Sequence, residues 1–153
     1  MTKHKHYIDS IYYDLQLTSN VMKALGNQIF EKLEIGITPL EHAALDTIFC
    51  NAGICQRDLA KLIFKDRANT GRVLDSLEEK GYITRFIDMK NNRLVKKMGI
   101  TEKGHQKLEE VNEIFENFFA DLESSVSGKE IDKLQKSLKK LRESLLEIVN
   151  MKI

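Results

Sequence analysis

Residues 55–104 constrain this fold most, because their pattern changes from helical to strand-like within a single segment. Two short helices are predicted, at about 56–63 and 67–80, separated by a turn at Lys65-Asp66 and ended by Gly81. Two runs of β-forming residues follow at about 82–87 and 93–99, joined by the polar turn Lys90-Asn91-Asn92. The residues expected to face inward from the two helices are Leu59, Ala60, Leu62 and Ile63, then Thr70, Val73, Leu74 and Leu77.

Long amphipathic helices are predicted on both sides of this segment. One apolar stripe runs over residues 6–33, and a shorter helix follows from the capping sequence Thr38-Pro39-Leu40-Glu41 to about residue 51. Another helix begins near Thr101, and apolar residues at heptad spacing then run from Ile131 to Ile148. This heptad stripe either packs on the protein's own core or pairs with a partner subunit. The pattern is typical of a mostly α-helical protein with a small β-hairpin.

Charge is distributed unevenly along the chain. Residues 55–105 contain 12 Lys and Arg against 7 Asp and Glu, although the net charge of the whole chain is only +1. The segments before and after it each have two more acidic than basic residues. Clustered basic side chains attract a polyanion, and nucleic acid is the commonest polyanion that a small helical module meets.

Composition excludes several other classes of protein. The 153 residues suit about one domain, and no apolar run reaches the length of roughly 18 residues that a membrane span needs. Two cysteines are too few for a disulfide scaffold, which favours a reducing, cytoplasmic location. No phosphate-binding loop, nucleophile motif or catalytic cluster is evident, and His4 and His6 lack further metal ligands at suitable spacing. We therefore expect no enzyme activity, no metal and no cofactor.

Helix, turn, helix and hairpin in this order predict a winged helix–turn–helix. The second helix of such a motif enters the major groove of DNA, where residues near its start reach base edges. Arg67, Asn69 and Arg72 lie at that start, on the face opposite Val73 and Leu77. Arginine suits guanine and asparagine suits adenine, and either can instead bind phosphate. A solvated helix face would show the same residues, but the local positive charge favours the DNA interface.

The local sequence also resembles the MarR/SlyA family of bacterial transcription regulators. The matching pieces are Gln56-Arg57-Asp58-Leu59-Ala60, the run from Arg72 to Gly81, and Ile100-Thr101-Glu102-Lys103-Gly104, in the family's order. The resemblance implies a homodimer with interlocking terminal helices that binds a pseudo-palindromic operator in double-stranded DNA. It implies residues 1–37 and 105–153 as the helical dimerisation region and residues 38–104 as the winged helix, in one compact unit. A repressor released by a small aromatic or amphipathic ligand is the expected function.

The resemblance and the charge pattern together define the candidate site residues. The expected DNA contacts are Gln56, Arg57, Lys65, Arg67, Asn69, Thr70, Arg72, Asn91 and Arg93. Arg93 occupies the place of the family's wing arginine, but Asn92 stands where the family usually has an acidic residue. Cys55 stands where Ser or Thr commonly caps a helix, and a thiol caps poorly.

The sequence leaves open what would release such a regulator from DNA, and whether DNA binding is its function. Tyr12, His42, Phe49 and Phe115 are candidates for an effector pocket, although aromatic residues at helical spacing more often belong to the core. Cys50 and Cys55 are candidates for oxidation sensing, against the reading that both are buried and inert. A third reading, from another class, is a winged helix used for protein–protein assembly.

Overall fold

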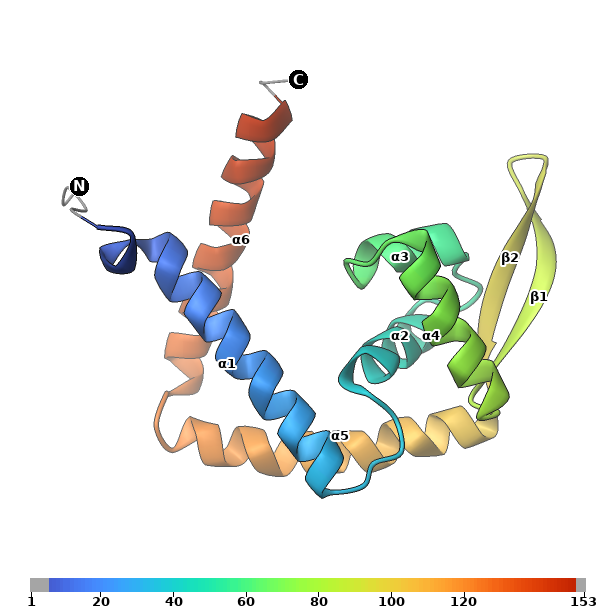
Figure 1. The fold of residues 1–153 in the computed structure, drawn as a ribbon, viewed down its shortest axis with the longest axis horizontal. Helices are drawn as coiled ribbons and strands as arrows, with labels where there is room; N and C mark the ends of the chain where they lie inside the picture. The colour runs from blue at the N-terminus through green and yellow to red at the C-terminus, as the bar shows by residue number, and fades with distance from the viewer. Residues whose placement is uncertain (1–5, 151–153) are drawn as a thin grey trace. The chain divides into compact units, whose positions relative to one another are not determined.

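The computed structural model describes residues 6–150 and divides the chain into two compact units, residues 1–109 and 110–153. Its elements are η1 (Tyr7–Asp9), α1 (Ile11–Lys32), α2 (Pro39–Cys50), α3 (Gln56–Leu62), α4 (Arg67–Glu79), β1 (Ile83–Lys90), β2 (Arg93–Ile100), α5 (Glu102–Glu123) and α6 (Gly128–Asn150) (Figure 1). The predicted fold class, mostly α with one β-hairpin, is confirmed. The division into two units differs from the single unit expected, and the assignment of both ends to dimerisation stays a prediction.

The first unit begins with helices whose ends follow their capping residues. Ser10 accepts a hydrogen bond from the backbone N of Tyr13 and so starts α1 after a short 3-10 turn. In α2, Thr38 and Glu41 form the predicted capping box, with the Glu41 carboxylate accepting from Thr38 N at 2.7 Å. The same carboxylate is buried and accepts bonds from Ser76 of α4 and from Lys80, the residue that follows this helix. One acidic side chain therefore caps α2 and ties it to α4.

The core of the first unit lies where α2, α3 and α4 meet. Leu45, Ile48, Leu59, Leu74 and Leu77 are at most 1% exposed, as the apolar spacing of these helices predicts. Leu62 is a correction to the expected inner face of α3, because its side chain is 54% exposed. Leu59 and Ile63 are four positions apart and are both buried, whereas Leu62 lies beside this buried face.

The hairpin is a regular antiparallel pair with a two-residue turn. Ile83 pairs with Ile100 and Lys90 pairs with Arg93, which leaves only Asn91 and Asn92 between the strands. Both asparagines have positive φ, 51° and 59°, as a type I′ turn requires and as asparagine tolerates. Cys55 forms an isolated antiparallel bridge with Lys97, so the segment before α3 is joined to the edge of β2.

A close backbone contact fixes the start of α5. Thr101 Oγ1 donates to Gly81 O at 2.6 Å and accepts from Gly104 N at 3.0 Å, which joins the end of α4 to the first turn of α5. A Cβ atom at Gly104 would overlap the carbonyl oxygen of Tyr82. The Ile100–Gly104 sequence thus has a physical role, because only glycine allows the helix to approach so near.

The second unit contains the end of α5 and all of α6. Ser127 and Glu130 form hydrogen bonds in both directions at the start of α6, as the predicted capping sequence requires. The heptad stripe of α6 is largely uncovered, with Leu134, Leu145 and Ile148 at 56%, 52% and 50% exposure. Among the described residues, no helix is long and apolar enough to cross a membrane.

Candidate nucleic-acid interface

The start of α4 presents three polar side chains to solvent. Asp66 caps the helix through Asn69 N at 2.8 Å, and the Asn69 amide also donates to Asp66 Oδ2 at 2.6 Å. These bonds, the backbone one foremost, lower the pKa of Asp66. Arg67 and Arg72 are exposed beside this cap. Asn69 is therefore held in one orientation by the cap, while both guanidinium groups are accessible to an incoming anion.

Thr70 does not belong to this exposed surface. Its side chain is fully buried, and its hydroxyl donates to the backbone oxygen of Asp66 at 2.8 Å. The apolar spacing of α4 already places Thr70 on the inner face with Val73 and Leu74. We therefore withdraw Thr70 from the expected DNA contacts, because a duplex has no access to it.

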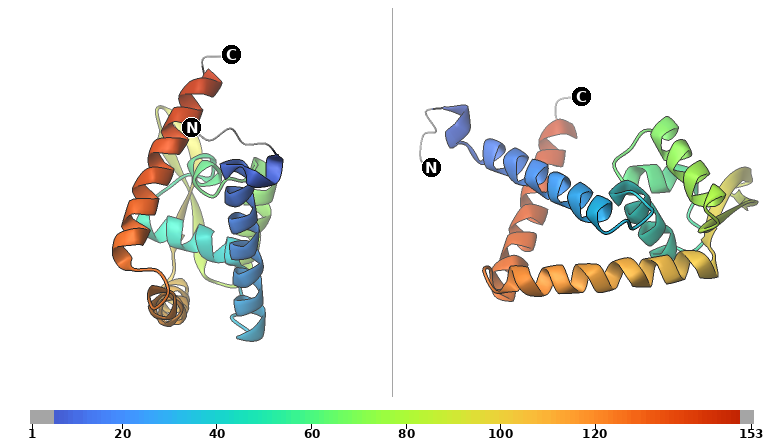
Figure 2. Two further views of the ribbon diagram at one scale, coloured as in Figure 1. Left: turned by 90° about the vertical axis from the view of Figure 1, so that its left-hand side faces the viewer. Right: turned by 60° about the horizontal axis from the view of Figure 1, so that its bottom comes forward.

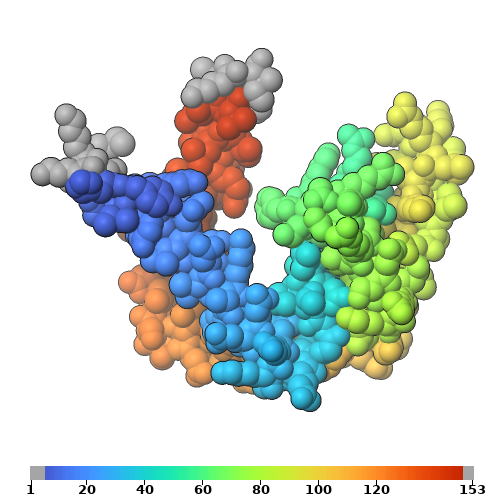
Figure 3. All heavy atoms as spheres, in the orientation of Figure 1, coloured from blue at the N-terminus to red at the C-terminus, as the bar shows by residue number. Residues whose placement is uncertain are grey.

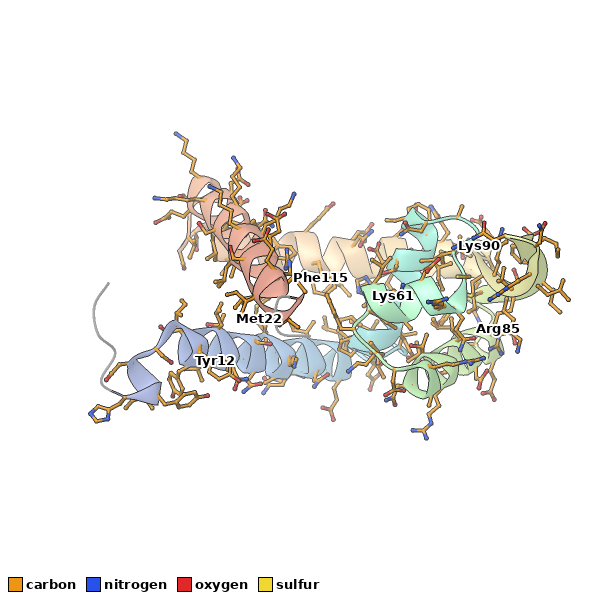
Figure 4. All side chains as sticks on the ribbon, turned by 90° about the horizontal axis from the view of Figure 1, so that it is seen from above. Tyr12, Met22, Lys61, Arg85, Lys90 and Phe115 are labelled. Atoms are coloured by element: carbon orange, nitrogen blue, oxygen red, sulfur yellow. The ribbon has the colours of Figure 1, made fainter. Side chains whose placement is uncertain are left out.

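Three further candidates surround α3 and the turn before α4. Arg57 and Lys65 are exposed, and Gln56 is half-buried against α4. A methyl group at Gly71 would lie 3.5 Å from Nε2 of Gln56, so Gly71 faces α3 rather than solvent. Its small size permits the packing of the two helices. Lys61 of α3 is an exposed cation that the sequence analysis did not select as a candidate. Figure 4 labels Lys61 and Lys90 of the hairpin.

The tip of the hairpin carries the remaining candidates. Asn91 and Arg93 are both exposed at the turn. In Figure 1 this tip and the beginning of α4 lie toward the same upper edge of the first unit. Figure 3 shows the yellow atoms of the hairpin projecting beyond the green atoms of α4. Arg67 and Arg72 of α4 and Arg93 at the hairpin turn are therefore all exposed on the winged helix.

Two ion-pair systems hold the hairpin against the helices, and neither was predicted from the sequence. Lys90 Nζ donates to Asp58 Oδ2 of α3 at 2.6 Å, and this bond is the main reason that the pKa of Asp58 is lowered. Arg85 binds Asp75 at 2.7 Å and Glu78 at 2.8 Å, both in α4, and Glu78 contributes most to raising the pKa of Arg85. The partners lie on different elements, 32 positions apart for Lys90–Asp58 and 10 and 7 positions apart for the two Arg85 pairs, and no helical or strand periodicity signals them.

The candidate effector residues occur in separate aromatic contacts. The ring of Tyr12 lies 5.8 Å from that of Tyr7, His42 contacts Phe30 at 5.8 Å, and Phe49 contacts His105 at 5.2 Å. Burial lowers the pKa of His42, which favours its neutral form. Tyr12 and Phe30 are 18 positions apart on α1, roughly 27 Å at the usual helical rise. Tyr12 and His42 therefore do not line one small pocket within the first unit, and Phe115 belongs to the second.

The two cysteines differ in their surroundings. Cys50 is exposed, which corrects the expectation that both are buried, whereas Cys55 is only 7% exposed. Cys55 makes no capping bond at the start of α3, as predicted for a thiol. Its Sγ instead donates to Asp58 Oδ2 at 3.2 Å, the same oxygen that binds Lys90.

The fold and its exposed basic edge define a winged helix–turn–helix, which Figure 2 shows from two further sides. The family model of the MarR family matches residues 37–95. This match covers most of the winged helix, from just before α2 to the beginning of β2.

Solved structures extend the similarity to most of the chain. A solved structure of Staphylococcus aureus MepR in complex with DNA is 26% identical, with a TM-score of 0.74 over 92% of this chain and 99% of that chain. The structure of the transcriptional regulator SlyA is 26% identical, with a TM-score of 0.73 over 90% and 95%. An uncharacterised HTH-type transcriptional regulator of Bacillus subtilis, YybA, is 30% identical over 97 residues. That alignment spans 63% of this chain and 63% of YybA.

Proposed function

We propose that this protein is a dimeric, sequence-specific regulator of transcription that binds double-stranded DNA. The observation that carries the proposal is the exposure of Arg67 and Arg72 near the start of α4 and of Arg93 at the turn of the hairpin. A helix start of this kind suits the major groove, and a basic hairpin beside it suits the neighbouring backbone or minor groove. The matched MarR-family model and the DNA complex of MepR support the same conclusion.

The exposed polar residues of the winged helix are expected to contact different parts of the DNA. Arg72 faces outward one turn into α4, where a side chain reaches base edges. Arg67 precedes it at the helix start, and Arg57 and Lys65 lie where they can bind phosphate. Asn91 and Arg93 serve the wing. Gln56 is half-buried with its amide against Gly71, so it positions α3 on α4.

Selection of bound sequences from random duplexes is the experiment that tests this function. We expect an enriched palindrome with half-sites about one helical turn apart, since a two-fold dimer places its recognition helices about 34–36 Å apart. Affinity for the enriched duplex should fall linearly on a log–log plot against salt. If no duplex is enriched and binding is absent at low salt, the DNA-binding function is wrong and the protein-assembly reading takes its place.

Dimerisation is proposed through the terminal helices, on the basis of their uncovered apolar residues. Ile11 and Met22 of α1 are 57% and 68% exposed, and the α6 stripe includes Leu134 and Leu145, which are more than half exposed. Extended apolar surface of this kind marks an interaction site. Leu134→Glu with Leu145→Glu should give a monomer in sedimentation analysis. Lys136→Glu, on the opposite face of the heptad, is the matched control and should remain dimeric.

Gating by a small aromatic or amphipathic ligand, with repression in its absence, completes the proposal. The contact Phe30–His42 joins α1 to α2, and the contact Phe49–His105 joins α2 to α5. A ligand that separates such a pair would disturb the helix that carries it. A screen of aromatic acids and amphiphiles for release of the selected duplex tests the gating. Phe49→Ala should alter the concentration needed for release, whereas an unchanged value excludes this residue.

Thiol oxidation is a second candidate trigger, favoured by one specific contact. The Cys55 thiol and the Lys90 ammonium both donate to Asp58 Oδ2, which connects the thiol to the wing. Oxidation of the sulfur removes its donated proton and adds polar oxygens in a buried position. Peroxide should then release DNA from wild-type protein and from Cys50→Ser, but not from Cys55→Ser. Release that persists in Cys55→Ser excludes this mechanism.

A further inference from the structure

The wing carries apolar side chains that its position in the fold does not bury. Ile87, Met89 and Leu94 are 69%, 55% and 74% exposed. Strand alternation places Ile87 and Met89 on one face of β1, and Leu94 pairs with Met89 across the hairpin. Met98, on the same face at the base of the hairpin, is fully buried. This face of the hairpin therefore belongs to the core at its base, whereas its apolar side chains near the tip are exposed.

The exposed apolar pair Met89–Leu94 is next to the basic residues at the end of the hairpin. Met89 and Leu94 occupy the pair next to Lys90 and Arg93, the last pair before the turn. A two-residue type I′ turn follows, so the tip is short and has a defined register. Two flexible or branched apolar side chains thus project within one residue of two basic side chains.

Charge indicates which occupant this surface suits. Residues 83–100 contain five Lys and Arg and a single acidic residue, Asp88. Asp88 is itself paired with Lys97 at 2.7 Å, so it offers little repulsion to an anion. Among the described residues, Arg93 and Lys96 form no ion pair. An occupant that meets this tip has to combine a polyanionic exterior with an apolar interior.

The minor groove of a duplex has this combination, because phosphates line its walls and stacked bases form its floor. Proteins that bind there frequently insert an apolar side chain between base steps and bend the duplex. A second copy of this chain is the poorer occupant. This face offers only three exposed apolar side chains, in a strongly basic setting, and stable protein interfaces bury about 800 Å² on each partner.

We propose that Met89 and Leu94 form an apolar wedge that enters the minor groove and partly unstacks a base step. This inference rests on the proposed DNA-binding function and adds to it a contact that reads deformability. Arg93 binds the groove beside the wedge, and Leu94 leads because it is the most exposed of the three. Pyrimidine–purine steps unstack at the lowest cost, so the operator should favour TA or CA steps under the wing.

The test uses full-length protein and the duplex obtained by selection, with 2-aminopurine placed at successive positions under the wing. Unstacking raises the fluorescence of this base analogue. We expect a rise at one step with wild-type protein and its loss in the double variant Met89→Gln/Leu94→Thr. Both substitutions are at exposed strand positions, so the fold should persist. Ile87→Thr, on the same face but farther from the tip, is the matched control and should keep the rise.

The possible outcomes distinguish the apolar wedge from the proposed DNA-binding function. Salt-dependent binding without a fluorescence rise at any position overturns the wedge and leaves DNA binding intact. Absence of duplex binding overturns both. Self-association of DNA-free protein that the double variant abolishes, while the rise on DNA is unchanged, shows that the patch binds a second copy and overturns the wedge. Loss of the rise in the double variant alone, with the salt slope retained, supports it.

Discussion

Lys90 Nζ lies 2.6 Å from Asp58 Oδ2, and this ion pair connects the wing to α3 across 32 positions of sequence. The pair satisfies the ammonium group at the place where a phosphate would otherwise bind it. Removing the carboxylate charge therefore changes the number of cations that the wing offers to DNA.

Asp58→Asn should tighten binding to the selected duplex, because it frees Lys90 for a phosphate. One additional phosphate contact steepens the log–log salt slope by about 0.9. Fluorescence anisotropy across a salt series measures both effects. Adding Lys90→Gln to Asp58→Asn should return the slope to the wild-type value, and a slope that stays steep would show that Lys90 is not the cation involved.

Arg93→Ala and Arg72→Ala should have different consequences for sequence preference. The wing substitution should weaken all duplexes alike, whereas Arg72→Ala should cost roughly 1–3 kcal/mol on the cognate duplex and relax the preference at one base pair. Competition binding against single-base variants of the operator distinguishes them. Equal losses on every sequence for both variants would sink the base-reading role of Arg72.

Gly104→Ala should destabilise the protein strongly. The new methyl group would overlap the Tyr82 carbonyl oxygen and lie 2.8 Å from Cγ1 of Ile100. Overpacking of this kind costs about 1–3 kcal/mol, and more where backbone has to move. Gly128→Ala is the matched control, since a Cβ there meets nothing within 4 Å. Thermal unfolding should show a clearly lower Tm for the first variant and an unchanged or higher Tm for the second.

The buried Glu41 should make stability depend on pH. Burial alone would raise the pKa of Glu41, but bonds from Ser76, Thr38 N and Lys80 together lower it below its ordinary value. Because the folded-state pKa is lowered, the stabilisation is present above the unfolded value of roughly 4.3 and is lost as pH falls through the folded one.

The variant Glu41→Gln should therefore lower the free energy of unfolding at neutral pH by about 1–3 kcal/mol, since charge-assisted hydrogen bonds are lost. Its stability should also change less than that of wild type on acidification below the ordinary glutamate pKa. Urea titrations at several pH values measure this, with the exposed Glu79→Gln as control. Parallel pH profiles for wild type and Glu41→Gln would contradict the assignment.

Local signals predicted the elements of the first unit well. Thr38, Asp66 and Gly81 carry the chemistry that starts or ends a helix, so α2 and α4 end within a residue of their predicted bounds. The two asparagines that accept positive φ likewise mark the hairpin turn. These features depend on neighbours within four or five positions, which the sequence displays directly.

Predictions failed at single residues and at contacts between elements. Leu62 is exposed beside the buried Leu59 and Ile63, and the burial of Thr70, which the apolar spacing of α4 had indicated, excludes it from the DNA contacts that the resemblance had suggested. The pairs Asp58–Lys90 and Arg85–Glu78 join different elements, and no periodicity reports them. The contacts of the individual site residues with DNA stay predictions.

The Asn91-Asn92 turn has a mechanical consequence for recognition. A type I′ turn of two residues has no spare backbone, and every residue beside it is committed to a strand pair. The wing consequently has a fixed length and a fixed reach toward the DNA. It cannot stretch toward a wide groove or retract from a narrow one, so any misfit has to be absorbed by the double helix.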